Sequence, residues 1–241
     1  MLPPNIVVAP PISDPIAAYG VGGIAVIVAI VWLVIFSRHN VRRAIILTLG
    51  VVLLMTVGAI AALSGQLSRF DFLPPPMFFM IASVTVIAFS VGLSPFGRNA
   101  AAEISLYTLV GLQSFRFPLE LVMHYAGGAG IMPVQMSYSG FNLDIITGIG
   151  ALALLALHKL SVRMPLSVLW AWNIWGSLCL VVIYIIAIST SPIVRAFGDE
   201  PQNLNTWVLY FPYVWLPVVL VTIAISSHII ITRRLLAKGA T

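Results

Sequence analysis

Two residues of opposite charge, Arg116 and Glu120, stand one helical turn apart in the otherwise apolar segment Leu106–Ala126. A charge at the centre of a bilayer costs roughly 2.5–3.5 kcal/mol on insertion scales, so such residues normally face the protein interior and have partners. Gln113 and His124 fall on the same side of a helix, and we call these four residues the polar stripe. Within the stripe, Arg116 could bind an anionic group and Glu120 could carry a proton or a cation. In the purely structural alternative, the two charges neutralise each other and fix the helix register.

A glycine-rich loop, Gly127–Phe141, follows the polar stripe. Its glycines and its proline favour a folded turn or a re-entrant element over a helix. The polar side chains of the loop, Gln135 among them, could cover the mouth of the helix bundle. Asn142 and Asp144 then open the next apolar segment, where either residue can cap the helix. Alternatively, Asp144 turns inward to the polar stripe and completes a charged cluster.

Further polar residues occur inside or beside other apolar segments. Asn173 lies within an apolar run, which predicts a hydrogen bond between helices. Gln202 and Asn203 belong to a turn before the last apolar segment, and His228 lies near the far end of that segment. We treat these residues as secondary polar features rather than as the main site.

The sequence predicts no metal site and no cofactor. Its four histidines have no His-x-x-x-His or Glu-x-x-His spacing. The single cysteine, Cys179, excludes a disulfide framework and a thiolate metal cluster. A retinal Schiff base needs a lysine inside a membrane span, whereas Lys159 and Lys238 both fall at the ends of apolar segments.

The elements that must position these residues are apolar helices. The chain of 241 residues is 60% hydrophobic and only 8% charged, with a mean hydropathy of +1.06, whereas soluble domains are about 25% charged. We therefore predict an all-α, polytopic transmembrane bundle, in which about 20 helical residues cross a hydrocarbon core of about 30 Å. The predicted spans are Ala17–Phe36, Ala44–Leu63, Pro75–Leu93, Leu106–Ala126, Leu143–Leu160, Leu166–Ser189 and Trp207–Ile231.

Basic residues gather in alternate connections, which predicts the orientation. The connections between them carry only two basic residues, Arg69 and Arg195, and hold most of the acidic residues. By the positive-inside rule, the N-terminus is outside and the C-terminus is in the cytoplasm. We expect a short extracytoplasmic segment (1–16), a single seven-helix transmembrane domain (17–234) and a cytoplasmic tail (235–241). The basic set is Arg38, Arg42, Arg43, Arg98, Lys159, Arg163, Arg233, Arg234 and Lys238.

Several classes of function lack support in the sequence. The net charge is only +5 and the basic residues are not interleaved with aromatic ones on a polar face, so we expect no nucleic-acid partner. The chain has no serine nucleophile elbow, phosphate-binding loop or zincin signature. Glu103 is the only acidic residue on the predicted cytoplasmic side, where a membrane phosphotransferase needs several carboxylates. The lipid bilayer is the expected partner, and a protein partner or a homo-oligomer stays open.

Specific short motifs fill the second half of the chain. RFPLE contains Arg116 and Glu120, and the loop motif PVQMSYSGFNLDI covers Pro133–Ile145. Apolar drift would not readily produce Pro-x-x-Met followed by Gly-x-Asn-x-Asp-Ile. The remaining motifs are Trp172-Asn173, Pro201-Gln202-Asn203, YFPYVWLP (Tyr210–Pro217) and Ser227-His228.

With these motifs, the chain resembles an uncharacterised family of bacterial seven-span integral membrane proteins from about Gln113 to Arg234. The resemblance implies a small multi-pass protein of the bacterial cytoplasmic (inner) membrane, with its polar residues gathered toward the outer side. It brings no activity. It favours a common role for four polar residues in the fourth span and around the start of the fifth, namely Arg116, Glu120, Asn142 and Asp144.

Three functions fit these observations. The first is a non-enzymatic membrane protein with an outward-facing intramembrane polar pocket that binds or passes a small polar or anionic solute. The second is a membrane-embedded enzyme in which Glu120 or Asp144 is the general base and His124 its acid–base partner. The third is a structural or accessory subunit whose charged pair docks a partner helix. The candidate ligand-binding residues of the first function are Gln113, Arg116, Glu120, His124, Asn142 and Asp144.

Overall fold

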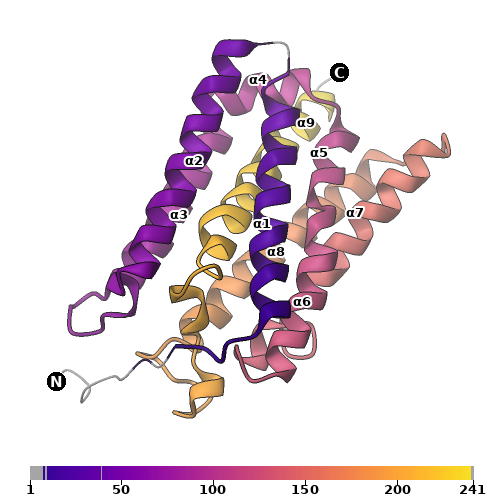
Figure 1. Ribbon diagram of the computed structural model, residues 1–241. Coiled ribbons are helices and arrows are strands. Elements are labelled where there is room, and N and C mark those ends of the chain that lie inside the picture. Colours follow the sequence, from indigo (N-terminus) through magenta and orange to yellow (C-terminus); the bar gives the residue numbers. More distant parts are fainter. Residues whose placement is uncertain (1–7, 9, 39, 240–241) are drawn as a thin grey trace.

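Helices joined by turns make up the protein, as predicted from its composition. The computed structural model describes residues 8, 10–38 and 40–239, and these residues contain no strand (Figure 1). Within this part of the chain, five helices are long and apolar enough to cross a membrane, which makes the chain a membrane protein. These helices are α1 (Pro15–Phe36), α2 (Val41–Leu63), α3 (Pro76–Leu93), α8 (Leu166–Ser189) and the continuous stretch Leu216–Ala237.

Two of the predicted spans are shorter or interrupted. The predicted fourth span consists of α5 (Leu106–Leu112), the 3-10 turn η2 (Gln113–Phe115) and α6 (Arg116–Gly128). Pro118, the third residue of α6, lacks a backbone donor, so the regular hydrogen-bond ladder is interrupted at the junction with η2. The predicted fifth span, α7 (Asp144–Lys159), has 16 residues.

The last predicted span, Trp207–Ile231, begins later than expected. Its first part forms the 3-10 turn η5 (Trp207–Leu209) and further turns, and regular winding starts with the π-helical η6 (Leu216–Val221). Pro212 and Pro217 explain this difference, because proline cannot donate the hydrogen bond that a helix interior requires. α9 (Thr222–Gly239) then runs through most of the predicted tail 235–241.

Smaller elements connect the long helices. Residues 1–7 and 9 of the predicted N-terminal segment, His39 and residues 240–241 of the predicted tail lie outside the described residues. The short elements are η1 (Gln66–Ser68), α4 (Pro95–Glu103), η3 (Val134–Met136) and η4 (Pro201–Asn203).

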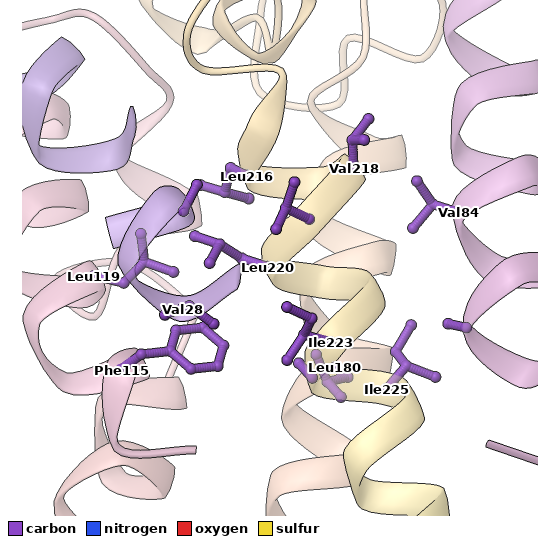
Figure 2. Packing of buried hydrophobic residues seen from close by; sticks show 14 of the residues in the cluster. Val28, Val84, Phe115, Leu119, Leu180, Leu216, Val218, Leu220, Ile223 and Ile225 are labelled. Atoms are coloured by element: carbon purple, nitrogen blue, oxygen red, sulfur yellow. The ribbon is translucent and has the colours of Figure 1, made fainter. Parts of the chain in front are cut away.

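The C-terminal helix forms the centre of the bundle. In the stretch Leu216–Ala237, 67% of the most apolar window is buried, against 6% in α2. In Figure 1 this yellow helix lies between the purple α2 and α3 and the pink-to-orange α5–α8 group. Leu216 and Leu220 point toward Leu119 of α6 (Figure 2). The apolar outer surface of α2 is left for lipid contact.

Candidate functional site

Arg116 and Asp144 form a buried ion pair between α6 and α7. The Nη1 atom of Arg116 lies 2.6 Å from Oδ1 of Asp144, and the two side chains are 1% and 12% exposed. The same Nη1 donates a second hydrogen bond, of 3.3 Å, to the carbonyl oxygen of Gly176 in α8. One guanidinium therefore ties three helices together.

The predicted pairing of Arg116 with Glu120 is wrong. No ion pair joins these two residues in the part of the chain that the structure describes. Instead, Asp144 has turned inward, which was the alternative to a capping role. Gly148 allows this arrangement, because a Cβ at this position of α7 would collide with the backbone of Phe117 in α6. The close approach of the two helices brings Asp144 to Arg116.

Glu120 is held by an amide rather than by a cation. Nδ2 of Asn142 donates hydrogen bonds to Oε1 of Glu120 at 2.6 Å and to the carbonyl oxygen of Met136 at 3.0 Å. The other side of the amide, Oδ1, accepts a hydrogen bond of 3.3 Å from the backbone N–H of Asp144. Glu120 is 1% exposed, and its Oε2 has no hydrogen-bond partner among the described residues.

One small cavity is lined by Arg116, Glu120, Asn142 and Asp144. Its volume is about 40 Å³. One water needs about 10–15 Å³ measured in this way, so the cavity has room for a few water molecules and for little else. Leu119 and Leu220, which both belong to the wall, are labelled in Figure 2. The apolar part of the wall is Phe115, Leu119, Met123, Leu180, Ile183, Leu216, Leu220, Val221 and Ala224.

The structure separates His124 from this cavity, which corrects the prediction of a four-residue polar stripe. His124 is exposed, forms a hydrogen bond with the Ser139 side chain and stacks on Tyr138 at 4.5 Å between ring centroids. Four residues turn an α-helix by about 40° beyond a full turn, so His124 is rotated by about 80° from Arg116 around α6. Gln113 is fully buried but lies outside the wall of the cavity.

The cavity lies in a region of the chain that matches a known protein family. The family described as a domain of unknown function, DUF8737, matches residues 73–236. The chain belongs to the DUF8737 family. The resemblance to a family without an assigned activity is thereby confirmed, and the matched region contains all four cavity residues of this DUF8737 protein. Searches of curated proteins and of solved structures found no match.

The secondary polar residues of the DUF8737 region do not join the cavity. Gln135 is partly exposed, Gln202 is exposed, and Asn203 donates a hydrogen bond of 3.1 Å to Glu200 on the surface. Asn173 forms the predicted hydrogen bond between helices, with Nδ1 of His228 at 2.8 Å.

The sequence did not reveal the two backbone carbonyls, of Met136 and Gly176, that complete the site. A backbone carbonyl has no signature in residue type. The one available signal was Gly176 in the middle of the apolar helix α8, because a glycine there allows another element to approach the backbone closely. In the described ranges, no group of three or more His, Cys, Asp or Glu residues could hold a metal ion.

Proposed function

We propose that this DUF8737 protein crosses a bacterial cytoplasmic membrane seven times, with its N-terminus outside and its C-terminus in the cytoplasm. The end of α1, the start of α2, α4 and the end of α9 lie at the same end of the bundle (Figure 1), and the basic connections belong to that end. The α5–α6 unit and α7 supply the two spans beyond the five long helices. The division into residues 1–16, 17–234 and 235–241 follows this topology.

In this topology, we propose that Glu120 binds and releases a proton while the cavity binds or passes a small polar solute. The observation that carries the proposal is a buried carboxyl group without a cation, since Arg116 is paired with Asp144. An ionised carboxylate in such a place is uncompensated and costly. Proton uptake removes the charge, and the small cavity can hold the water that delivers the proton.

Charge balance argues against the anionic solute that the sequence also allowed. The cavity wall holds two carboxyl groups and one guanidinium, and the guanidinium already donates to Asp144 and to Gly176. Both of these hydrogen bonds come from Nη1, and Nη2 of Arg116 has no partner among the described residues. An incoming anion could therefore gain one donor, but it would meet two carboxyl groups and only one guanidinium, which is already paired with Asp144. A volume of about 40 Å³ also limits the solute to the size of a few waters unless the bundle opens.

The two other predicted functions have less geometric support. An acid–base pair of Glu120 with His124 needs both groups in one cavity, and His124 lies on the exposed side of α6. Docking of a partner helix on the charged pair needs an accessible pair, and Arg116 and Glu120 are each 1% exposed.

Proton entry into proteoliposomes with an entrapped pH dye tests the proposal. Under an imposed membrane potential, vesicles with the wild-type protein should acidify faster than empty vesicles, and Glu120→Gln vesicles should match empty ones. Glu103→Gln is the matched control, because Glu103 is exposed, is paired with Arg43 at 2.8 Å and lies outside the wall of the cavity. Equal rates for the wild type and Glu120→Gln would contradict the proposal.

A further inference from the structure

A long apolar cleft separates α2 from α1, α3 and α9. Its volume is about 500 Å³, which lies within the range of about 300–1,000 Å³ that is typical of small-molecule sites. Ile46, Gly50, Leu53 and Val57 of α2 lie three or four residues apart, so they share one face of the helix and form one side of the cleft. These four residues are exposed, and the cleft therefore opens toward lipid.

The length of the cleft matches one leaflet of a bilayer. From Ile46 to Val57, α2 rises about 16 Å, at about 1.5 Å per residue. Half of a hydrocarbon core of about 30 Å is about 15 Å. The cleft is therefore about as long as the acyl chain of a lipid in the leaflet on this side.

The wall of the cleft suits a hydrocarbon chain. It contains no charged side chain. Its two hydroxyl groups, those of Thr222 and Ser226, donate to backbone carbonyls one turn earlier at 2.8 Å each. The Nε1 atom of Trp32, which also belongs to the wall, is buried. A polar part of any ligand must therefore lie beyond the cleft, at one of its ends.

Arginines lie at the end of the cleft where α2 begins. Arg42 precedes Ile46 by four residues, so it stands one turn above the cleft on the same face of α2. Arg42 is exposed and forms no ion pair within the described ranges. Glu103, the one acidic residue at this end of the bundle, is already paired with Arg43 at 2.8 Å.

A further arginine lies at this end on the opposite side of the cleft. Nη1 of Arg233 in α9 donates hydrogen bonds of 2.8 and 3.0 Å to the carbonyl oxygens of Gly92 and Ser94. Gly92 directly follows Val91, which belongs to the wall. Carbonyl oxygens do not neutralise the charge of Arg233, so this end of the cleft is positively charged on both sides.

We propose that this cleft binds an anionic phospholipid, with one acyl chain in the cleft and the phosphate at Arg42. A guanidinium binds a phosphate through two hydrogen bonds, and the excess of positive charge at this end favours a headgroup with a net negative charge over a zwitterionic one. A second copy of this chain offers no free countercharge, because the one carboxylate at its own basic end is Glu103, which Arg43 already neutralises. The proposal does not depend on the role of Glu120.

Photoaffinity labelling of the full chain in lipid nanodiscs tests this site. The probes are phosphatidylglycerol and phosphatidylcholine that carry the same diazirine-bearing acyl chain, and mass spectrometry locates the label. We expect phosphatidylglycerol to label α2 and α9 around the cleft at least about fivefold more than phosphatidylcholine, as the attraction of one arginine predicts. Equal labelling by the two probes, or a cleft that neither probe labels because another protein occupies it, would overturn the proposal.

One pair of variants tests the place of the acyl chain. A Cβ at Gly50 would meet no heavy atom within 4 Å, so Gly50→Phe fills the cleft without a clash and should abolish the labelling around it. Leu49→Phe, at the neighbouring exposed position outside the wall, should leave the labelling unchanged. Labelling of α9 that persists in Gly50→Phe would place the acyl chain elsewhere and contradict the site.

A second pair of variants tests the headgroup. Arg42→Gln should reduce the preference for phosphatidylglycerol about fivefold, because it removes the arginine that has no ion pair. Arg163→Gln is the matched control, since Arg163 is an exposed arginine of the connection between α7 and α8, outside the cleft. Equal preferences in the two variants would contradict the binding of the phosphate by Arg42.

Discussion

Arg116 of α6 is paired with Asp144 of α7 at 2.6 Å, rather than with Glu120 four residues along its own helix. This choice of partner decides the chemistry of the cavity. It satisfies the arginine with a carboxylate from another helix and leaves the second carboxylate, Glu120, with an amide. The ion pair ties two helices together, and in the proposed function Glu120 is the group that takes up a proton.

Loss of one partner of the Arg116–Asp144 pair should destabilise the protein strongly. Arg116→Gln leaves Asp144 buried without its cation, and we expect the free energy of unfolding to fall by about 3–5 kcal/mol. Asp144→Asn should have a loss of the same order, and the double variant should lose less than the sum of the two. Equilibrium unfolding in mixed micelles measures these values, and strictly additive losses would argue against a direct interaction.

Gly176 should not tolerate a methyl group. A Cβ at this position would lie 2.5 Å from Cε1 of His228 and 2.7 Å from Cγ2 of Thr147. Gly176→Ala therefore overpacks the contact between α7, α8 and α9, and we expect a loss of about 1–3 kcal/mol in the free energy of unfolding. Gly50→Ala is the control, because its Cβ would meet nothing within 4 Å in the described structure. An equal effect of the two substitutions would refute the predicted crowding.

Asp14 should make the α1–α6 contact sensitive to acid. Its Oδ1 accepts a hydrogen bond of 2.9 Å from the backbone N–H of Ala17, and its Oδ2 accepts one of 2.9 Å from the hydroxyl of Tyr125. The hydrogen bond from the backbone of Ala17 lowers the pKa of Asp14 below its ordinary value, and the hydrogen bond from the side-chain hydroxyl of Tyr125 adds to this effect. Desolvation opposes the shift. A lowered pKa in the folded state means a stabilisation that is fully present above the ordinary pKa and lost as the pH falls through the lowered one.

The matching measurement is thermal unfolding from neutral to strongly acidic pH. Asp14→Asn removes the titrating group. The wild type should therefore unfold at a higher temperature than this variant at neutral pH, and this difference in midpoint should shrink as the pH falls through the lowered pKa of Asp14. A difference in midpoint between the two proteins that is constant with pH would show that this carboxylate does not support the fold.

The sequence predicted the helical membrane class and the place of the cavity, but not the partners within it. Spacing along a helix puts Arg116 and Glu120 on similar faces, yet it does not determine which neighbouring helix approaches them. That approach depends on Gly148, whose missing side chain lets α7 reach the backbone of α6. Without the relative position of the two helices, the choice between a capping and an inward Asp144 could not be made.

The late start of the last span has a signal in the sequence that the apolar composition outweighed. Pro212 and Pro217 interrupt the run Trp207–Ile231, and the structure forms turns and a π-helical segment there before α9 begins. The exposure of His124 has a different cause. About 80° of rotation separates it from Arg116 on a regular helix, so residues at the two edges of the polar stripe need not face the same neighbours. Local patterns therefore located elements well and individual side chains less well.

Infrared difference spectroscopy of the carboxyl groups, between acid and alkaline pH and in protein reconstituted into lipid, tests the central claim most directly. We expect a carboxyl C=O band that disappears reversibly as Glu120 loses its proton, that is absent in Glu120→Gln, and that persists in Glu103→Gln and His124→Ala. A spectrum of Glu120→Gln identical to that of the wild type would contradict the account, because Glu120 would then exchange no proton.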